Sequence, residues 1–331
     1  MSGAPRELAG WSGSIAQARL INRLTVAFVL DVISIARDEL HLLDALLLST
    51  IVQANVAPIS RQADLQVAFA GPDEAPPDEM RRPVSINAVA TSLGMPFETA
   101  RRRIRALAAR DLCEIGEGGV IVPETVLTSP EYLKNAFAAY ERLRAFYYQL
   151  RDLGLLPALP PPSVEFASGQ VPVRTVARLA ADYVLRVIET IMQALGDVAQ
   201  GYVLLEIFRS NVEHLAAEVR GREGLAAGDF VDDALRRPIR VNTLAERVGL
   251  PPETTRRHVG RLLADGYVVK TPAGLVVPAV ALTRPRLVGF MGANLVNLQR
   301  MFAGLAQLGV LAVWDQLNPR TQPAGQIPQN G

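Results

Sequence analysis

Residues 236–278 read RRPIRVNTLAERVGLPPETTRRHVGRLLADGYVVKTPAGLVVP, and residues 81–123 read RRPVSINAVATSLGMPFETARRRIRALAARDLCEIGEGGVIVP. The two stretches align without a gap at an offset of 155 residues, and 16 of their 43 positions are identical. A repeat of this length is far too long for one turn of a solenoid. The sequence therefore predicts a structural unit that is present twice in one chain.

The similarity continues more weakly on both sides of the two stretches. Upstream, apolar residues recur at the same offset, and one inserted residue then brings Asn55 onto Asn211. Downstream, Leu153-Gly154 aligns with Leu308-Gly309. We expect each copy to contain two apolar helices, a variable connector, the repeated unit and a long final helix.

These boundaries divide the chain into two repeats. We predict a first repeat at 1–156, a stiff Pro-rich linker at 157–172, a second repeat at 173–317 and a disordered tail at 318–331. Two copies of one unit usually bury matching surfaces, so we expect a pseudo-two-fold arrangement that imitates a homodimer. A homodimer of the whole chain stays open.

Two short helices are expected in the first copy of the unit. Ser85 and Asn87 are good N-cap residues, since their side-chain oxygens accept hydrogen bonds from free backbone N–H groups. Gly94 follows where a residue with positive φ would end the first helix, and Pro96 suits the start of the second. The core-facing positions of that second helix, which should end near Arg110, are Ala100, Ile104, Leu107 and Ala108.

A β-hairpin should follow the second helix in each copy. The predicted strands are Leu112–Ile115 with Val120–Val122, and Tyr267–Lys270 with Leu275–Val277. The order helix, sharp turn, helix and hairpin, with residues 242–257, closely resembles bacterial winged helix-turn-helix transcriptional regulators. The resemblance covers 81–123 and 236–278 and implies a mainly α fold with small β wings.

In that fold the second helix enters the major groove of double-stranded DNA, and its outward residues meet base edges and phosphates. An arginine can grip guanine through two hydrogen bonds or hold a phosphate, and both roles stay open here. The predicted DNA-binding residues are Glu98, Thr99, Arg101, Arg102 and Arg105 in the first copy, and Glu253, Thr254, Arg256, Arg257 and Arg261 in the second. The pairs Arg81-Arg82 and Arg236-Arg237 either hold phosphates or form ordinary polar connectors.

The acidic residue of each reading helix has its own interpretation. Glu98 stands four residues before Arg102, and Glu253 stands four residues before Arg257. Such pairs support a helix by roughly 0.2–0.5 kcal/mol. We favour orientation of the arginine by the carboxylate, with simple helix support or acceptance from cytosine as alternatives.

Local charge supports a nucleic-acid surface. The whole chain carries a formal charge of only +1, but residues 81–110 hold seven arginines and one acid, a balance of +6. Residues 236–265 hold seven arginines and three acids, a balance of +4. Two basic clusters in a nearly neutral chain are typical of DNA binding. The wings, with Glu114 and Glu117 in one and Lys270 in the other, should contribute little.

Other function classes find little support. No GxxxxGK[ST], GxSxG or HExxH motif is present, so we expect no enzyme and no cofactor or metal. The single Cys113 fits a reducing cytoplasm and a buried thiol. His41 and His214 read as structural, whereas His258 suits DNA contact or solvent exposure.

The N-terminal region predicts no signal peptide and no membrane span. The most apolar stretch, 21–56, is interrupted by charged residues and therefore indicates buried helices. The interrupting residues are Asp31, Arg37, Asp38, Glu39 and Asp44.

The final helix of the first copy carries an aromatic load that the second copy lacks. Its aromatic residues are Tyr132, Phe137, Tyr140, Phe146, Tyr147 and Tyr148. Aromatics at helical spacing usually form core or a helix–helix interface, and the sharper alternative is a cavity for a small apolar effector.

Three functions are compatible with the sequence. The first is a transcriptional regulator. The second is a replication or partition protein that also binds DNA, and the third is a winged-helix scaffold that binds only protein. Differences at matched positions, such as Arg105 against Gly260, predict asymmetric DNA half-sites.

Overall fold

The computed structural model describes residues 13–38, 40–167, 169–215 and 230–317, and the tail predicted at 318–331 lies outside them. The described chain is mainly helical and contains two small antiparallel hairpins. The predicted class, mainly α with small β wings, is confirmed.

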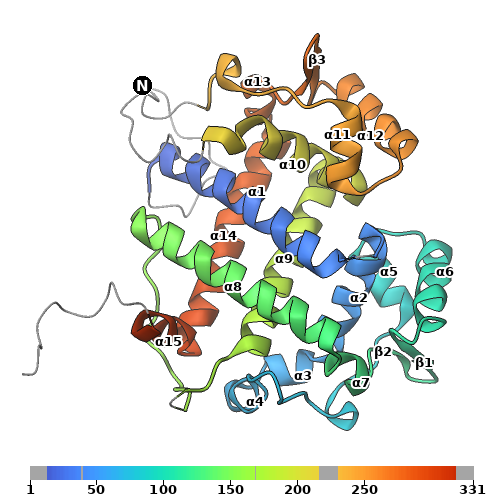
Figure 1. Cartoon of the computed structure of the whole chain (residues 1–331), viewed down its shortest axis with the longest axis vertical. Coiled ribbons are helices and arrows are strands. Elements are labelled where there is room, and N and C mark those ends of the chain that lie inside the picture. Colours follow the sequence, from blue (N-terminus) through green and yellow to red (C-terminus); the bar gives the residue numbers. More distant parts are fainter. Residues whose placement is uncertain (1–12, 39, 168, 216–229, 318–331) are drawn as a thin grey trace, which may run out of the picture.

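Four helices of 23 residues each form the centre of the molecule, where α1 and α8 run side by side across α9 and α14 (Figure 1). These helices are α1 (Ile15–Arg37), α8 (Pro130–Asp152), α9 (Val173–Leu195) and α14 (Pro285–Gln307). Their ends follow local chemistry, since Ser14 forms a capping box with Gln17 and Gly196 ends α9 in the left-handed region at φ 78°.

The remaining elements form two sets, whose order matches from α5 to α7 in the first and from α11 to α13 in the second. The first set is α2 (Leu42–Asn55), α3 (Ala57–Ser60), α4 (Ala63–Ala68), η2 (Asp78–Met80), α5 (Ile86–Ser92), α6 (Phe97–Ala108), β1 (Glu114–Gly116), β2 (Gly119–Ile121) and α7 (Glu124–Leu127). The second set is α10 (Val198–Val212), η3 (Glu213–Leu215), η4 (Asp233–Leu235), α11 (Val241–Val248), α12 (Pro252–Ala264), β3 (Val269–Thr271), β4 (Gly274–Val276), α13 (Ala279–Leu282) and α15 (Val310–Leu317).

Each hairpin is held to the rest of its unit by one buried asparagine. Asn55, at the end of α2, donates to the carbonyls of Arg82 (2.8 Å) and Val120 (3.1 Å) and accepts from the Val122 N–H (3.0 Å). Asn211 makes the matching contacts in the second half, with distances of 2.7, 3.1 and 2.9 Å. The alignment of these two asparagines therefore corresponds to one structural role, performed twice.

Glycine is required where each hairpin passes under the strand-like segment before α5 or α11. A Cβ added to Gly119 (φ 123°) would lie 2.5 Å from the Val84 carbonyl oxygen. At Gly274 (φ 150°) it would lie 2.5 Å from the Ile239 carbonyl oxygen. Because the atoms that an added Cβ would meet belong to the backbone, they cannot move aside as the end of a flexible side chain could.

We therefore expect Gly119→Ala and Gly274→Ala each to lower the free energy of unfolding by about 1–3 kcal/mol. Urea denaturation at constant m-value measures the loss. Gly118→Ala is the matched control, because its nearest neighbour is the Pro83 side chain at 3.5 Å. An equal loss in this control would show that the hairpin tolerates no substitution at all, and the argument from Val84 would fail.

The two predicted repeats share one hydrophobic core. The C-terminal part of the first long helix in each repeat contacts the winged unit of the other repeat, an arrangement called here the exchange of helix ends. A single cluster of buried residues runs from Ala18 to Trp314. The Arg37 guanidinium, at the end of α1, donates to the Val248 carbonyl at the end of α11. In the matching place, the Met192 side chain of α9 lies beside Gly94, which follows α5. The first helix of each half thus supports the unit of the other half.

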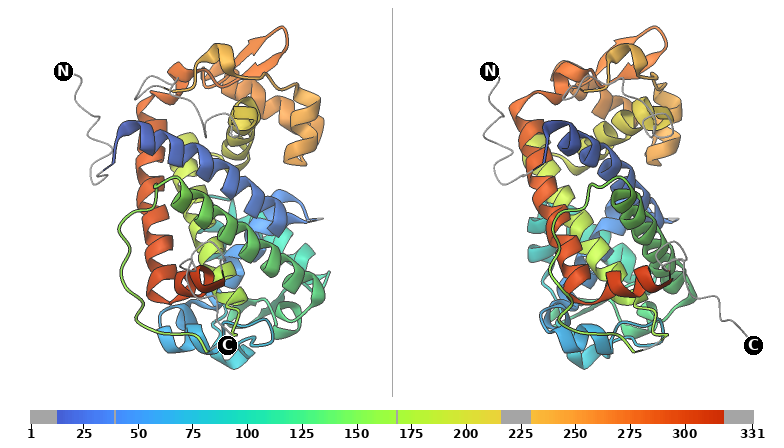
Figure 2. Two further views of the ribbon diagram at one scale, coloured as in Figure 1. Left: turned by 60° about the vertical axis from the view of Figure 1, so that its left-hand side comes forward. Right: turned by 90° about the vertical axis from the view of Figure 1, so that its left-hand side faces the viewer.

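The segment between α8 and α9, where the linker was predicted, runs along the side of α14 (Figure 2). Its described residues form no helix or strand. Ser163 binds the Gln307 carbonyl through its backbone N–H (2.8 Å) and its hydroxyl (3.0 Å). The segment is therefore fastened to the end of α14.

The aromatic residues of α8 mostly serve the core. Phe146 stacks on Phe28 of α1 with a centroid distance of 4.5 Å, and Tyr140 meets the Trp314 ring edge-on at 5.8 Å. The Trp314 Nε1–H donates to the Tyr140 hydroxyl (2.9 Å). The core interpretation is confirmed for Tyr140, Phe146 and Tyr147, which are buried, but Phe137 is exposed. Of the aromatic set, only Tyr132 lines a large cavity described below.

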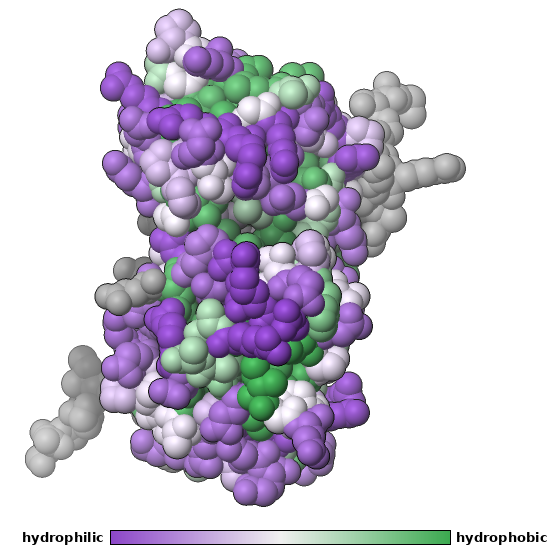
Figure 3. Space-filling view, turned by 90° about the vertical axis from the view of Figure 1, so that its right-hand side faces the viewer, coloured by the Kyte–Doolittle hydropathy of each residue, from purple (hydrophilic) through white to green (hydrophobic). Residues whose placement is uncertain are grey.

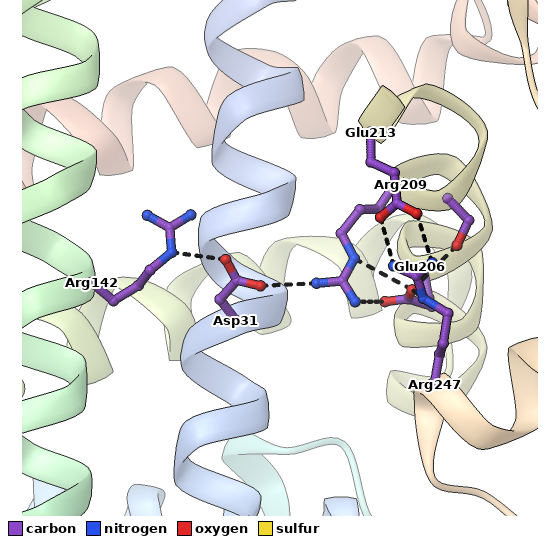
Figure 4. Close-up of polar contacts among 7 residues, drawn as sticks. Asp31, Arg142, Glu206, Arg209, Glu213 and Arg247 are labelled. Carbon is purple, nitrogen blue, oxygen red and sulfur yellow. Dashed lines mark hydrogen bonds and ion pairs between the residues drawn. The ribbon is translucent and has the colours of Figure 1, made fainter. Parts of the chain in front are cut away.

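A chain of ion pairs joins the central helices to the second unit (Figure 4). Its members, in spatial order, are Arg142, Asp31, Arg209, Glu206, Arg247 and Glu213. Fully buried Glu206 pairs with Arg209 (2.7 Å) and with Arg247 of α11 (2.6 Å). The position of α11 is therefore tied to α10 and, through Arg209 and Asp31, to α1.

Candidate nucleic-acid interface

Helix α6 presents one apolar and one basic face, as its spacing predicted. Ala100, Ile104 and Leu107 are almost completely buried against the unit. Arg102 and Arg105 lie exposed on the opposite face, and Arg101 is partly exposed beside them. The outward arginines are therefore accessible to a ligand in solution.

The acidic residue of α6 pairs with a different arginine from the one predicted. Glu98 binds Arg101, three residues on, at 2.6 Å, and Glu253 binds Arg256 at 3.2 Å. The predicted partners Arg102 and Arg257 are exposed and make no ion pair with these acids in the described structure. The hydrogen bond from Arg101 lowers the pKa of Glu98 and raises the pKa of Arg101. The carboxylate thus orients Arg101 and leaves Arg102 free to turn.

Helix α12 repeats this arrangement with fewer cations. Val259 and Leu262 face the core, while Arg256, Arg257 and Arg261 are exposed. Arg261 lies 3.8 Å from Asp197, so part of its charge is compensated. Thr99 and Thr254 are half-buried at the matching position near the start of each helix.

The two basic helices lie on the same side of the molecule, α12 in the upper part and α6 in the lower part (Figure 1). Seen from that side, strongly hydrophilic side chains gather in both halves of the surface (Figure 3). One extended ligand could contact both helices without passing around the molecule.

Of the two alternatives for Arg81 and Arg236, phosphate contact is wrong. Both side chains are buried, and each pairs with an acid three residues before it, Asp78 or Asp233. Burial lowers the pKa of both arginines. Arg81 also donates to the Val122 carbonyl at the end of its hairpin. These two residues fix the unit to the segment before it.

The neighbouring residues Arg82 and Arg237 are exposed, and both alternatives, phosphate contact and polar connector, stay open for them. Each is held at its backbone, where the N–H donates to the Asn55 or Asn211 carbonyl at 3.0 Å. The backbone of both residues is therefore fixed, while their side chains extend into solvent.

Replacing Arg81 and replacing Arg82 should have different effects, the first on stability and the second on DNA binding. We expect Arg82→Ala to leave stability within about 0.5 kcal/mol and to lower the salt slope of DNA binding by about 1. Arg81→Ala should cost about 2–3 kcal/mol of stability, because it removes a buried guanidinium that bonds a carboxylate and a carbonyl. Fluorescence anisotropy over a salt series, with urea denaturation, measures both. A loss of stability in Arg82→Ala would reject the assignment.

A partly buried ion pair in the first unit was not predicted from the sequence. Arg103 of α6 pairs with Asp44 in the first turn of α2 at 2.8 Å. The aligned residue His258 is buried, so the expected DNA contact or solvent exposure is wrong. Its spacing from Thr255 and Leu262 places it on the inward face of α12.

The other residues singled out in the sequence have structural roles. His41 caps α2 by accepting from the Leu43 N–H (3.2 Å), and the His214 ring contacts the Leu235 carbonyl (3.0 Å). Burial raises the pKa of Cys113 to about 11, so its thiol stays protonated and unreactive. Within the described ranges, no group of three or more His, Cys, Asp or Glu residues could hold a metal ion.

In the part of the chain that the structure covers, no single helix is long and apolar enough to cross a membrane. The pair α14 and α15, bent by 75°, satisfies the length and composition criteria only when the two are joined.

Comparison with known proteins gives one match, and it falls on the second unit. Residues 238–269, which span α11, α12 and the start of β3, match the winged helix-turn-helix DNA-binding family. No curated protein and no solved structure matches the chain. The second unit is thus similar to a family that binds double-stranded DNA, through the elements that carry Arg256 and Arg257.

Proposed function

We propose that this protein is a sequence-specific transcriptional regulator that binds double-stranded DNA through two winged helix-turn-helix modules, which arose by duplication of one unit. The observation that carries the proposal is the pair of basic helices on one side of the molecule, each with exposed arginines at matching positions. The family match at 238–269 supports DNA binding by the second module. The matched contacts of Asn55 and Asn211 support the same architecture in the first.

The DNA site should be an imperfect inverted repeat. A pseudo-two-fold arrangement of α6 and α12 favours half-sites whose centres lie about 10 bp apart, or a multiple of that spacing. The reading surfaces differ, since Arg105 stands where the second copy has Gly260 and Ser85 stands where it has Arg240. The half-sites should therefore be related but unequal.

Genome-wide occupancy mapping followed by binding to an isolated duplex tests this function. We expect sites at many promoters, and an affinity for the duplex that falls steeply with salt. Occupancy confined to one origin cluster would favour a replication or partition protein. Absence of any salt-dependent DNA binding would reject the proposal in favour of a protein-binding scaffold.

A further inference from the structure

A cavity of about 560 Å³ opens in the first half between α1, α2, α8 and α9, next to the first winged unit. Its buried aliphatic lining residues include Val32, Val122, Ala136 and Ala139. Its mouth carries exposed charged residues, which are Asp38, Arg110, Glu131 and Lys134. A space of this size is ordinary for a small-molecule site.

The same place in the second half is filled. There the cavity has only about 60 Å³, and most of its lining residues align with lining residues of the first cavity at an offset of 155 or 156. Phe290 and Met291 occupy the positions of Asn135 and Ala136, and Leu287 replaces Tyr132. The fold can therefore close this space with ordinary apolar side chains, and the first half leaves it open.

Arg178 is one of the lining residues of the open cavity and forms no ion pair with a described acid. Arg178 is only 6% exposed and donates to the Phe69 carbonyl (2.9 Å), the Gln66 carbonyl (3.3 Å) and the Thr175 hydroxyl (2.8 Å). All three acceptors are neutral, and its Nε has no partner among the described residues. A buried charge without an opposite charge is costly, so an anion in the cavity would be stabilised.

Other polar groups in the wall support an anion. Tyr132 and Asn135 line the cavity, and among the described residues their side chains form no hydrogen bond. Of the charged lining residues, Arg37, Arg110, Lys134 and Arg178 are cations, and only Asp38 and Glu131 are acids. Lys134 lies 3.4 Å from Asp38, which compensates that acid at the mouth.

The cavity also touches the first reading module. Arg110 and Leu112, just after α6, and Val122, just after β2, belong to its wall. A ligand there would contact the segment that joins the reading helix to its wing. An effector changes DNA affinity only if it binds more tightly to the protein when α6 is in one position than when α6 is in another.

We propose that this cavity binds a small aliphatic carboxylate, with the carboxylate near Arg178 and Tyr132 and the hydrocarbon chain in the space that Phe290 and Met291 fill in the second half. Binding there regulates DNA affinity through the first module, and this second part rests on the proposed function.

Isothermal titration calorimetry of the full chain with octanoate tests the site, with octan-1-ol and octylammonium as probes of equal chain length. We expect octanoate to bind at least 10-fold more tightly than octanol, and octylammonium to bind not at all. Equal affinity for octanoate and octanol, or no binding of octanoate, would overturn the proposal.

Two sets of variants locate the site. Asn135→Phe with Ala136→Met copies the filled cavity of the second half and should weaken octanoate binding at least 20-fold. Arg178→Gln should reduce octanoate to the affinity of octanol. Arg174→Gln is its matched control, since Arg174 is equally buried and bonds the Pro72 and Leu127 carbonyls but does not line the cavity. Equal losses in the two arginine variants would reject a direct role of Arg178, even if the double variant failed to fold.

The regulatory part has a separate readout. Saturating octanoate should change the Kd for a specific duplex at least 5-fold, and should have no effect on the Asn135→Phe, Ala136→Met variant. An unchanged Kd would overturn the regulatory part. Failure to bind DNA under any condition would instead reject the proposed function, while the calorimetric result would stand.

Discussion

Replacing Arg101, Arg102, Arg256 and Arg257 by alanine will weaken specific DNA binding at least about 100-fold at near-physiological salt. These four residues lie on the outward faces of α6 and α12, and each can contribute about 1–3 kcal/mol through a bidentate base contact or less through a phosphate. The slope of affinity against salt should also fall, by about 1 for each lost phosphate contact. Fluorescence anisotropy across a salt series measures both quantities.

The fold should survive this change, because none of the four side chains is buried in the core. Arg144→Ala is the matched control, since Arg144 of α8 pairs with Glu141 in the same three-residue spacing as Arg101 with Glu98. We expect the control to bind DNA as the parent does. Unaltered binding by the fourfold variant would show that the reading helices are wrongly assigned.

Replacing Glu206 by glutamine will destabilise the protein by about 2–4 kcal/mol. Breaking a buried ion pair from one side typically costs about 3–5 kcal/mol, because a charge is left without its partner. Here Arg209 and Arg247 each keep a second acid, Asp31 and Glu213, which reduces the cost. Urea denaturation should show a lower midpoint at an unchanged m-value.

Glu213→Gln provides the contrast within the same network. The Glu213 side chain is 45% exposed, and exposed ion pairs contribute about 0–1 kcal/mol. Its replacement should therefore shift the midpoint only slightly. If both variants lost equal stability, burial of Glu206 would not be the reason for its effect.

Local features of the fold followed from the sequence, because they depend on nearest neighbours along the chain. Ser85 caps α5 by accepting from the Ala88 N–H, and Gly94 adopts φ 58° at its end, as predicted. The inward face of α6 followed from helical spacing. At the turn, each strand extends one residue further than predicted, and at its other end it is one or two residues shorter. Outside β1–β4, Val84 and Ile239 form isolated bridges to Val120 and Leu275.

The errors at Arg81, Arg236 and His258 have physical causes. A sequence gives the charge of an arginine but not its burial, and here burial depends on Asp78 and Asp233 folding back over the side chains. A signal was present, because an acid stands three residues before each arginine. For His258, helical spacing alone would have placed the ring inside.

The exchange of helix ends was beyond the reach of sequence reasoning. Apolar spacing shows that α1 and α9 are buried, but it contains no information on which unit each one supports. The cavity shows a similar limit. The replacement of Asn135 and Ala136 by Phe290 and Met291 is visible in the alignment, but only the structure shows that these positions face a common space.

On the proposed function, the exchanged helix ends fix the spacing of the two DNA half-sites that the protein can bind. Because Arg37 of α1 holds the end of α11 and Met192 of α9 lies against Gly94, neither reading unit can rotate without disturbing a helix of the shared core. The distance and relative orientation of the two DNA-reading helices should then be fixed. Inserting about 5 bp between the half-sites turns one of them to the opposite face of the double helix, out of phase with its reader. Flexibly tethered domains would tolerate such a change of helical phase, and this molecule should not.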